Sequence, residues 1–295
     1  MNNLVGQGAG SRIFDVANYT FLACLLFLTL YPFYYVAIVS ISGGEAIARG
    51  EVTWWPTDVN FEAYKLILQD DSILVAYRNT ILYTVTGTLI SLAMTTLCAY
   101  PLSRKRLVFR RPFMWLIVFT MMFRGGIIPT YLLVQSLGML DTIWAIVLPL
   151  AIGVWYMVIM RTFFMALPDS LEESAYIDGA NDFQILLRVI LPLSKAIIAT
   201  LIVFYSVQHW NSFFPALIYL TSEDKFPLQI ILRNIVIAGD ISQQQSGIGI
   251  GSGFMVVEKT IKYAVIMITT LPIMMVYPFL QKHFVKGVLI GSIKG

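Results

Sequence analysis

Charged residues are scarce in this 295-residue chain. Asp, Glu, Lys and Arg make up 13% of it, whereas hydrophobic residues make up 58%. Soluble domains carry roughly 25% charged residues, so the scarcity excludes the soluble globular class and indicates a membrane protein. The net charge of +3 is small. We therefore expect the lipid bilayer as the surroundings of the chain and no nucleic acid as a partner.

Cysteine and histidine are also scarce. Cys24 and Cys98 both lie in apolar runs, which excludes a disulfide framework and a metal-binding cysteine spacing. His209 and His283 are the two histidines, and neither belongs to a His-Glu-x-x-His pattern. The long apolar runs also hold no pair of aspartates, so an intramembrane protease is excluded. We expect no metal site and no catalytic residue.

Two further absences narrow the function. No acidic residue lies well inside an apolar run, although proton- and sodium-driven transporters carry such acids for coupling. The chain also lacks the Gly-x-x-x-x-Gly-Lys-[Ser/Thr] loop that binds nucleotide phosphates. The run 247-GIGIGSG-253 has no dinucleotide-binding spacing, and we interpret it as an external loop. We expect no cofactor in this chain and no ATP hydrolysis by it.

Six apolar runs are present, each long enough to cross a bilayer as a helix of about 20 residues. They comprise residues 16–41, 79–102, 113–134, 142–164, 194–220 and 261–281. Several contain Pro or Gly, which membrane helices tolerate where neighbours satisfy the freed backbone groups. The sequence thus predicts an all-α fold with six transmembrane helices in a single domain, residues 1–295.

Basic residues gather in the loop between the second and third runs. The segment 103-SRKRLVFRRP-112 holds five basic residues and no acidic one, whereas residues 42–78 hold three basic and six acidic residues. The tail, residues 282–295, is also basic. Because loops rich in Lys and Arg stay in the cytoplasm, we expect the 103–112 loop, the tail and the N-terminus there. Residues 42–78 and 221–260 are then outer loops.

A charged segment separates the fourth and fifth runs. The sequence 168-PDSLEESAYIDGANDFQILLRVILP-192 holds five acidic residues, and alternation of the spans puts it in the cytoplasm. Asp169, three residues before Glu172, predicts a helix start with an aspartate capping box. Gly179 predicts a break, and a second short helix should end at Pro192.

Apolar residues recur at helical spacing through this segment. They are Tyr176, Ala180, Phe183, Leu187 and Ile190. Such an amphipathic segment either lies on the membrane surface or presents a face to a protein partner. Helices that bind anionic lipid are usually basic, so the acids favour a protein partner. A solvated, purely structural loop remains the alternative.

The residue pattern of the segment resembles the EAA motif of ABC importer permeases. Glu173-Ser174-Ala175 is followed, after three residues, by Gly179, and nine residues further by Val189-x-Leu191-Pro192, which is the spacing of that motif. Ser174 stands where the motif has Ala, and Val189 where it usually has Ile.

The resemblance extends along the chain. Residues 124–149 and 209–220 resemble the corresponding spans of carbohydrate permeases, and 286-KGVLIGSIKG-295 is similar to the tail of MalG-like subunits. By these residues the chain resembles a MalG-like carbohydrate permease of the LplC-like subgroup.

This resemblance implies a type I ABC importer in the bacterial cytoplasmic membrane. The implied partners are a homologous second permease, two ATPase subunits that bind ATP and Mg, and an extracytoplasmic sugar-binding protein. The implied cargo is an oligosaccharide, with an amino acid or peptide carried by the same machinery as the alternative. The EAA loop, about residues 165–193, should dock on the ATPase. The residues carried over are Glu172, Glu173, Ser174, Ala175, Asp178, Gly179, Ala180, Phe183, Leu191 and Pro192.

Two other regions acquire expectations from the same resemblance, and Arg124 acquires one from its neighbours in the sequence. The outer loop 221–260, with a short amphipathic helix at 226–239, should contact the binding protein. The tail Gly287–Gly295 should run along the ATPase interface. Arg124, before a pair of glycines, should mark a helix break, where it pairs with backbone carbonyls or serves an anionic sugar.

Polar residues also occur within the fifth run. They are Tyr205, Gln208, His209, Trp210 and Asn211. Polar groups at membrane depth face the bundle interior or water. These residues therefore either hydrogen-bond neighbouring helices or line the path of the sugar.

Overall fold

The computed structural model describes residues 9–123, 125–245 and 260–275. Every regular element in these ranges is helical, so the predicted all-α class is confirmed for them. The chain divides into two compact units. Among the described residues, one contains 9–69, 234–245 and 260–269, and the other contains 70–123, 125–233 and 270–275.

The first unit contains the N-terminal helix. Its elements are α1 (Ala9–Ser40), α2 (Gly44–Ala48), α3 (Glu62–Gln69), the later part of α14 (Leu228–Gln245) and most of a helix at Thr260–Met275. A small core forms where α1 ends, around Ile38 and Val39, with Ala46 of α2 and Val52. The hydroxyl groups of Ser40 and Tyr64 lie 2.7 Å apart and join α1 to α3.

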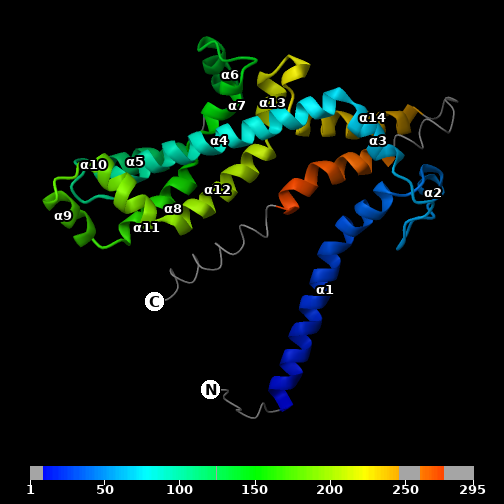
Figure 1. The fold of residues 1–295 in the computed structure, drawn as a ribbon, viewed down its shortest axis with the longest axis horizontal. Coiled ribbons are helices and arrows are strands. Elements are labelled where there is room, and N and C mark those ends of the chain that lie inside the picture. Colours follow the sequence, from blue (N-terminus) through cyan, green and yellow to red (C-terminus); the bar gives the residue numbers. More distant parts are fainter. Residues whose placement is uncertain (1–8, 124, 246–259, 276–295) are drawn as a thin grey trace. The chain divides into compact units, whose positions relative to one another are not determined.

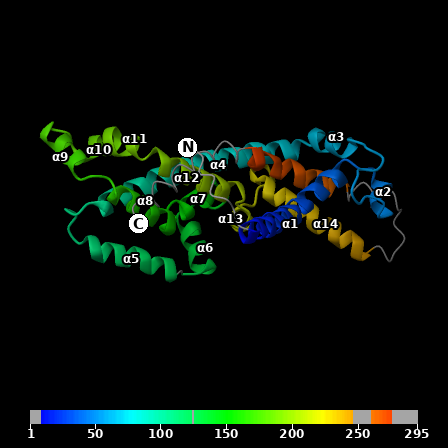
Figure 2. The same ribbon diagram turned by 90° about the horizontal axis from the view of Figure 1, so that it is seen from below.

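The second unit is built on the long helix α4 (Asp71–Ser103), with α8 (Val154–Met165) and α12 (Lys195–Trp210) packed along it (Figure 1). Its other elements before the EAA loop are α5 (Arg110–Met122), α6 (Ile127–Ser136), α7 (Ile143–Val147) and the short η1 (Leu148–Leu150). The EAA loop contains α9 (Ser170–Ile177), α10 (Asp182–Ile185), η2 (Leu186–Ile190) and α11 (Leu191–Leu193). After α12 come α13 (Phe214–Tyr219), η3 (Glu223–Lys225) and the start of α14. In Figure 2, α5 and the α9–α11 segment lie on opposite sides of α8.

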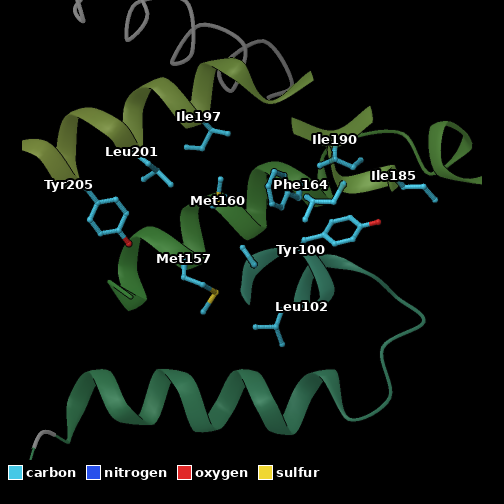
Figure 3. Packing of buried hydrophobic residues seen from close by; sticks show 12 residues of the cluster. Tyr100, Leu102, Met157, Met160, Phe164, Ile185, Ile190, Ile197, Leu201 and Tyr205 are labelled. Atoms are coloured by element: carbon cyan, nitrogen blue, oxygen red, sulfur yellow. The ribbon is translucent and has the colours of Figure 1, made fainter. Parts of the chain in front are cut away.

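The main hydrophobic core lies at the end of this unit that carries the EAA loop. Figure 3 shows side chains from α4, α8, the EAA loop and α12 converging on it. The buried members are Ala99, Tyr100, Leu102, Met157, Met160, Phe164, Ile185, Leu186, Ile190, Ile197, Leu201 and Tyr205. The EAA loop is thus part of the packed interior of the unit, because three of its residues are buried among residues of the long helices.

Apolar helices occupy the predicted runs within the described residues, and several of these helices are broken. Two helices, Gly10–Ser40 and Asp71–Ser103, are by themselves long and apolar enough to cross a membrane. Three bent helix pairs bring the candidates among the described residues to as many as five, and the shorter apolar helix Thr260–Met275 begins where the sixth predicted run begins. Residues 276–281 of that run lie outside the described residues.

The breaks have local causes. Helix α5 ends before Phe123, whose backbone is extended. Gly126, the residue before α6, adopts φ +87°, a conformation that favours glycine. Arg124, whose predicted role is at this break, lies outside the described residues. Between α7–η1 and α8 the bend is 51°. The fifth predicted run, 194–220, is two helices, α12 and α13, because Pro215 starts a new helix at its first turn.

Candidate functional site

Helix α9 begins where the sequence predicts, but not by the predicted cap. The carbonyl oxygen of Asp169 accepts hydrogen bonds from the N–H groups of Glu172 at 3.1 Å and Glu173 at 3.2 Å. The side chain of Asp169 makes no capping bond, because its backbone is already helical and an N-cap residue needs an extended backbone. The predicted capping box is therefore wrong. The carboxylate accepts a hydrogen bond from Lys105 Nζ at 2.8 Å instead, which lowers the pKa of Asp169.

Gly179 ends α9 in the left-handed conformation, with φ +81°. The Gly179 N–H donates to the Tyr176 oxygen at 3.0 Å, and the Ala180 N–H donates to the Ala175 oxygen at 3.0 Å, which together form a Schellman turn. A Cβ atom at position 179 would meet no heavy atom within 4 Å, so glycine is required by backbone conformation and not by space. The predicted break is confirmed. Ala175 and Ala180 pack, partly buried, against the main core.

A capping box starts α10. The Asn181 side chain accepts the Gln184 N–H at 2.9 Å, and the Gln184 side chain accepts the Asn181 N–H at 3.0 Å. Two N–H groups that the helix leaves unpaired are thereby satisfied. The sequence analysis did not identify this box, although Asn-x-x-Gln before an apolar run is a helix-start signal.

The helix that precedes Pro192 contains a wider, π-helical turn. Leu186–Ile190 form a π-helical segment, and Leu191–Leu193 return to α-helix. Proline has no N–H and its ring crowds the carbonyl group one turn earlier, so the turn before Pro192 opens. The chain then bends by 86° into α12. The predicted second short helix is confirmed, but its π-helical turn was not foreseen.

The break at Gly179 and the π segment change which apolar residues are buried. Ile185, Leu186 and Ile190 are buried, whereas Phe183 is 59% exposed and Leu187 is 48% exposed. The prediction of one apolar face is therefore wrong, because Phe183 and Leu187 are exposed whereas Ile190 is buried. Residues spaced by three and four share a side only along one continuous α-helix, and here the helix is interrupted twice.

Glu172 points into the protein and pairs with Arg104. Arg104 Nε and Glu172 Oε1 lie 3.0 Å apart, and the two side chains are 6% and 10% exposed. The atoms are not aligned for a hydrogen bond, so the attraction is one of charge. Arg104 also lies over the Tyr100 ring, 5.0 Å from its centroid. Burial raises the pKa of Glu172, and the nearby guanidinium opposes this only in part.

The two residues after Arg104 also bind acids of the EAA loop. Lys105 binds Asp169, as described above. Arg106 forms an ion pair with Asp182 and lies over the Tyr176 ring, 4.7 Å from its centroid. Three consecutive basic residues thus hold three acids spread over the loop. We refer to the ion pairs Arg104–Glu172, Lys105–Asp169 and Arg106–Asp182 as the clamp.

The other acids of the loop face outward. Glu173 and Asp178 are exposed and form no ion pair among the described residues. Beside them in the sequence, Ile177 is 86% exposed and Phe183 is 59% exposed. We refer to Glu173, Ile177, Asp178 and Phe183 as the exposed face. Of the residues predicted to meet an ATPase, Ser174, Gly179 and Pro192 are also exposed, whereas Glu172 is buried and Ala175, Ala180 and Leu191 are half-buried.

The polar residues of α12 hold it against α4 and α8. Tyr205 is fully buried; its hydroxyl group lies 2.6 Å from Thr95 Oγ1 and accepts the Gly153 N–H at 3.1 Å. His209 is buried too, with Nε2 3.1 Å from Ser91 Oγ. The helices approach closely here, since a Cβ atom on Gly87 would lie 2.7 Å from the His209 ring. For Tyr205 and His209 the geometry is that of helix–helix hydrogen bonds.

The remaining polar residues of α12 lie nearer the surface of this unit. Trp210 is buried and its ring lies 6.4 Å from that of Tyr77. Gln208 is half-buried and Asn211 is exposed. Asn211 Nδ2 donates to the Val207 oxygen at 2.9 Å, one turn earlier on the same helix. Of the residues predicted to line the sugar path, Gln208 and Asn211 are therefore the two that remain accessible.

A second polar cluster lies at the other end of the unit, around Asp141. Its carboxylate accepts the N–H groups of Thr221 and Ser222, each at 3.0 Å, the Ser222 hydroxyl at 2.6 Å and Lys225 Nζ at 2.6 Å. These hydrogen bonds, that of Lys225 foremost, hold the pKa of Asp141 well below its ordinary value. The sequence analysis did not identify Asp141, because its partners lie about 80 residues away.

The same turn is held against α4. Tyr83 donates its hydroxyl hydrogen to the Lys225 oxygen at 2.8 Å, and Asn79 Nδ2 donates to the Asp224 oxygen at 2.7 Å. The Leu228 N–H donates to Thr80 Oγ1 at 2.8 Å, where α14 begins. The predicted helix at 226–239 is confirmed as the first part of α14, and its start is fixed by α4.

The family of the chain follows from comparison with known proteins. Residues 72–290 match the family described as binding-protein-dependent transport system inner membrane component. The chain belongs to this family.

Individual relatives of this transport component agree with the match. Two proteins of Bacillus subtilis (strain 168) are each 43% identical to it. The polygalacturonan/rhamnogalacturonan transport system permease protein YtcP aligns over 97% of this chain and 99% of its own. Protein LplC aligns over 96% of both chains. The resemblance to LplC-like permeases is confirmed.

A solved structure shares the fold. One chain in the crystal structure of a bacterial ABC transporter involved in the import of the acidic polysaccharide alginate has a TM-score of 0.85 and 35% identity, covering 94% of this chain and 98% of that one. The fold is that of an ABC importer permease.

The predicted roles of the tail Gly287–Gly295 and of 247–253 concern residues outside those that the structure describes.

Proposed function

We propose that this chain is the permease subunit of an ATP-driven importer and forms half of the path for an oligosaccharide. Its partners would be a homologous second permease, two ATPase subunits and an extracytoplasmic sugar-binding protein. The chain would supply no cofactor; ATP and Mg would be bound by the ATPase subunits. Membership in the family of binding-protein-dependent transport components supports this division of labour.

The proposed topology has six spans, with both termini and the EAA loop in the cytoplasm. The basic loop 103–112 supports this orientation, because Lys and Arg in short loops remain on the cytoplasmic side. The clamp ties that loop to the EAA loop, so the two must lie on the same side of the membrane. The Asp141 cluster would then lie outside, where it could support the outer loop that meets the binding protein.

The observation that carries the proposal is the exposed face of the EAA loop. Ile177 and Phe183 are strongly exposed apolar side chains, and the exposed acids Glu173 and Asp178 lie near them in the sequence. Insertion of Ile177 and Phe183 into lipid would also carry the two nearby carboxylates into it, which is costly. Aromatic and aliphatic anchors within a polar rim are typical of a protein interface. We assign this face to the ATPase subunit.

The clamp explains how a push at this face could reach the spans. Three ion pairs join the EAA loop to the end of α4, and Ile185, Leu186 and Ile190 join it to the core shared with α8 and α12. Closure of two ATPase subunits upon ATP would move the two EAA loops together. Because the loop is packed as part of the unit, the helices would move with it as a rigid body and open the path outward.

The proposed cargo follows from the relatives. Their names refer to polygalacturonan, rhamnogalacturonan and alginate, all polysaccharides. We propose oligosaccharides of such polymers as the cargo. Gln208 and Asn211 are the side chains of α12 that we propose for the path, because they are accessible and can hydrogen-bond to sugar hydroxyl groups.

The test is purification of the tagged chain from native membranes in mild detergent, followed by mass spectrometry. An ATPase subunit, a second permease and a sugar-binding protein should be recovered with it. Phe183→Ala should lower ATPase recovery by roughly 30-fold, the effect of losing about 2 kcal/mol at an interface anchor. Leu193→Ala is the matched control, because Leu193 is 51% exposed in the same loop but outside the exposed face. Equal recovery by both variants would refute the docking assignment.

The cargo is tested separately. The recovered binding protein would be titrated with an oligogalacturonide and with a neutral glucose oligomer of equal length, and uptake of the tighter ligand would be measured in cells. Selective binding of an amino acid or peptide would overturn the carbohydrate assignment and leave the importer assignment standing.

A further inference from the structure

The basic loop 103–112 contains two groups of cations with different surroundings. Arg104, Lys105 and Arg106 each bind an acid of the EAA loop. Arg110 and Arg111, at the start of α5, form no ion pair with any residue that the structure describes, and the same holds for Arg161 of α8. The three acids of the clamp are already paired. Positive charge is therefore left over at this place.

These three arginines surround one cavity. It has a volume of about 290 Å³ and is lined by Arg110, Arg111, Met114, Trp115, Val118 and Arg161. Arg161 is held in place, because its Nε donates to the Leu102 oxygen at 2.8 Å. Three arginines thus line one cavity, and its other lining residues are Met, Trp and Val. Like charges held together in this way repel one another unless an anion lies between them.

The N-terminal end of α5 also favours binding of an anion. Helix α5 has 13 residues, no acidic residue in its first turn and no side chain that caps its first N–H groups. The N-terminus of a helix is its positive end, so Arg110 and Arg111 are placed where cations are unfavourable. An anion among the arginines would bind both the guanidinium groups and the helix end.

The apolar walls indicate what kind of anion. Trp115 is 77% exposed, and α5 has no buried residue along its length. In a membrane protein such a helix surface lies against acyl chains, and Trp is favoured at the headgroup level. A free phosphate ion would need polar groups on all sides. A phospholipid instead carries a charged phosphate next to acyl chains, and the acyl chains can pack on Met114, Trp115 and Val118.

We propose that Arg110, Arg111 and Arg161 form a binding site for the phosphate headgroup of an anionic phospholipid. Basic pockets between helices on the cytoplasmic side bind such headgroups in other membrane proteins. The site rests on the proposed orientation, which makes the cytoplasmic leaflet its source of lipid. It does not depend on the transport cycle, so its failure and that of the proposed function can be told apart.

The test is native mass spectrometry of the full-length chain, titrated with phosphatidylglycerol or with phosphatidylethanolamine of the same acyl chains. Phosphatidylglycerol should bind at least ten-fold more tightly. The double variant Arg110→Gln, Arg111→Gln should weaken its binding by about five-fold for each arginine removed. The double variant Arg188→Gln, Lys195→Gln removes two exposed cations from the same end of the unit and outside the cavity, and it should change the affinity by less than two-fold.

Four results would overturn the proposal. Equal binding of the two lipids would show that acyl chains alone are bound, and equal weakening by the two double variants would show a general effect of charge. Displacement of phosphatidylglycerol by millimolar inorganic phosphate would make this a site for free anions. If the assembled importer lost the lipid that the single chain binds, a carboxylate of the second permease would be the occupant. Arg161 is left unchanged in these variants, because its Nε also donates to the Leu102 oxygen and its removal could disturb the fold.

Discussion

The conformation of Gly179 decides which side chains that position can carry. Its φ of +81° costs an L-residue about 1–2 kcal/mol, and more for a β-branched residue, whereas Asn adopts this region readily. We expect Gly179→Val to disturb the Schellman turn and lower transport while ATPase activity persists, and Gly179→Asn to transport almost normally. Uptake measured together with ATP hydrolysis in proteoliposomes checks this. Loss of transport in both variants would indicate that the ATPase subunit leaves no room for a side chain at position 179, and that the turn conformation is not the reason for glycine.

Asp141 offers a second test on a single residue. Asp141→Asn removes the charge that attracts Lys225 and leaves a weaker acceptor for Thr221 and Ser222. Because the group is partly open to water, we expect a loss of about 1–2 kcal/mol of stability, measured by thermal unfolding in detergent.

The pH dependence of the Asp141 effect has a definite sign. The pKa of Asp141 is lowered in the folded state, so its contribution is present above its ordinary pKa and is lost as the pH falls through the lowered value. The difference between wild type and Asp141→Asn should therefore be constant around neutral pH and shrink only in strong acid. A difference that grows on acidification would contradict the assigned hydrogen bonds.

At the level of elements, the clamp holds the EAA loop by three ion pairs of unequal worth. Arg104→Met alone leaves Glu172 buried without a partner, which should cost about 3 kcal/mol or more. The double variant Arg104→Met, Glu172→Met should recover most of that loss, because two apolar side chains fill a buried site well. Lys105→Ala should change stability by less than about 1 kcal/mol, since the Lys105–Asp169 pair is exposed. Thermal unfolding of wild type, the single variants Arg104→Met and Glu172→Met, and the double variant gives the coupling energy of the Arg104–Glu172 pair, and additive losses would exclude a direct pair.

The elements also show what could be read from the sequence. The helix start near Asp169, the break at Gly179 and the end near Pro192 were predicted, because capping, left-handed glycine and proline act within a few residues. The partner of Asp169 was not predicted, because Lys105 lies in a distant loop. The division of the apolar positions into exposed Phe183 and Leu187 and buried Ile190 was missed, because a π segment gives no periodic signal in the sequence.

At the level of the whole molecule, apolar runs located the spans but not their bends. Hydropathy reports burial in lipid, which a bent pair of helices satisfies as well as a straight one. Among the polar residues of α12, spacing could not decide between helix contacts and a sugar path. That decision needed Gly87 and Thr95 of α4, whose closeness to His209 and Tyr205 depends on tertiary packing.

The proposed orientation gives a prediction for the whole chain. With Cys24 and Cys98 replaced by Ala, single cysteines at exposed positions can be labelled by a membrane-impermeant maleimide. Glu173→Cys should react only after the membrane is opened, and Glu223→Cys should react in intact cells. The reverse pattern would place the EAA loop outside and would contradict both the orientation and the ATPase contact.

The clamp has a consequence for how this protein can change over time. Three adjacent residues each have an assigned partner, at positions 169, 172 and 182, so the register of the loop is fixed as well as its charge. Substitutions there can be compensated one at a time. Insertion of a single residue between Tyr100 and Arg104 would shift all three cations against their acids at once. We therefore expect relatives to vary in residue type along 104–106 and to keep its length.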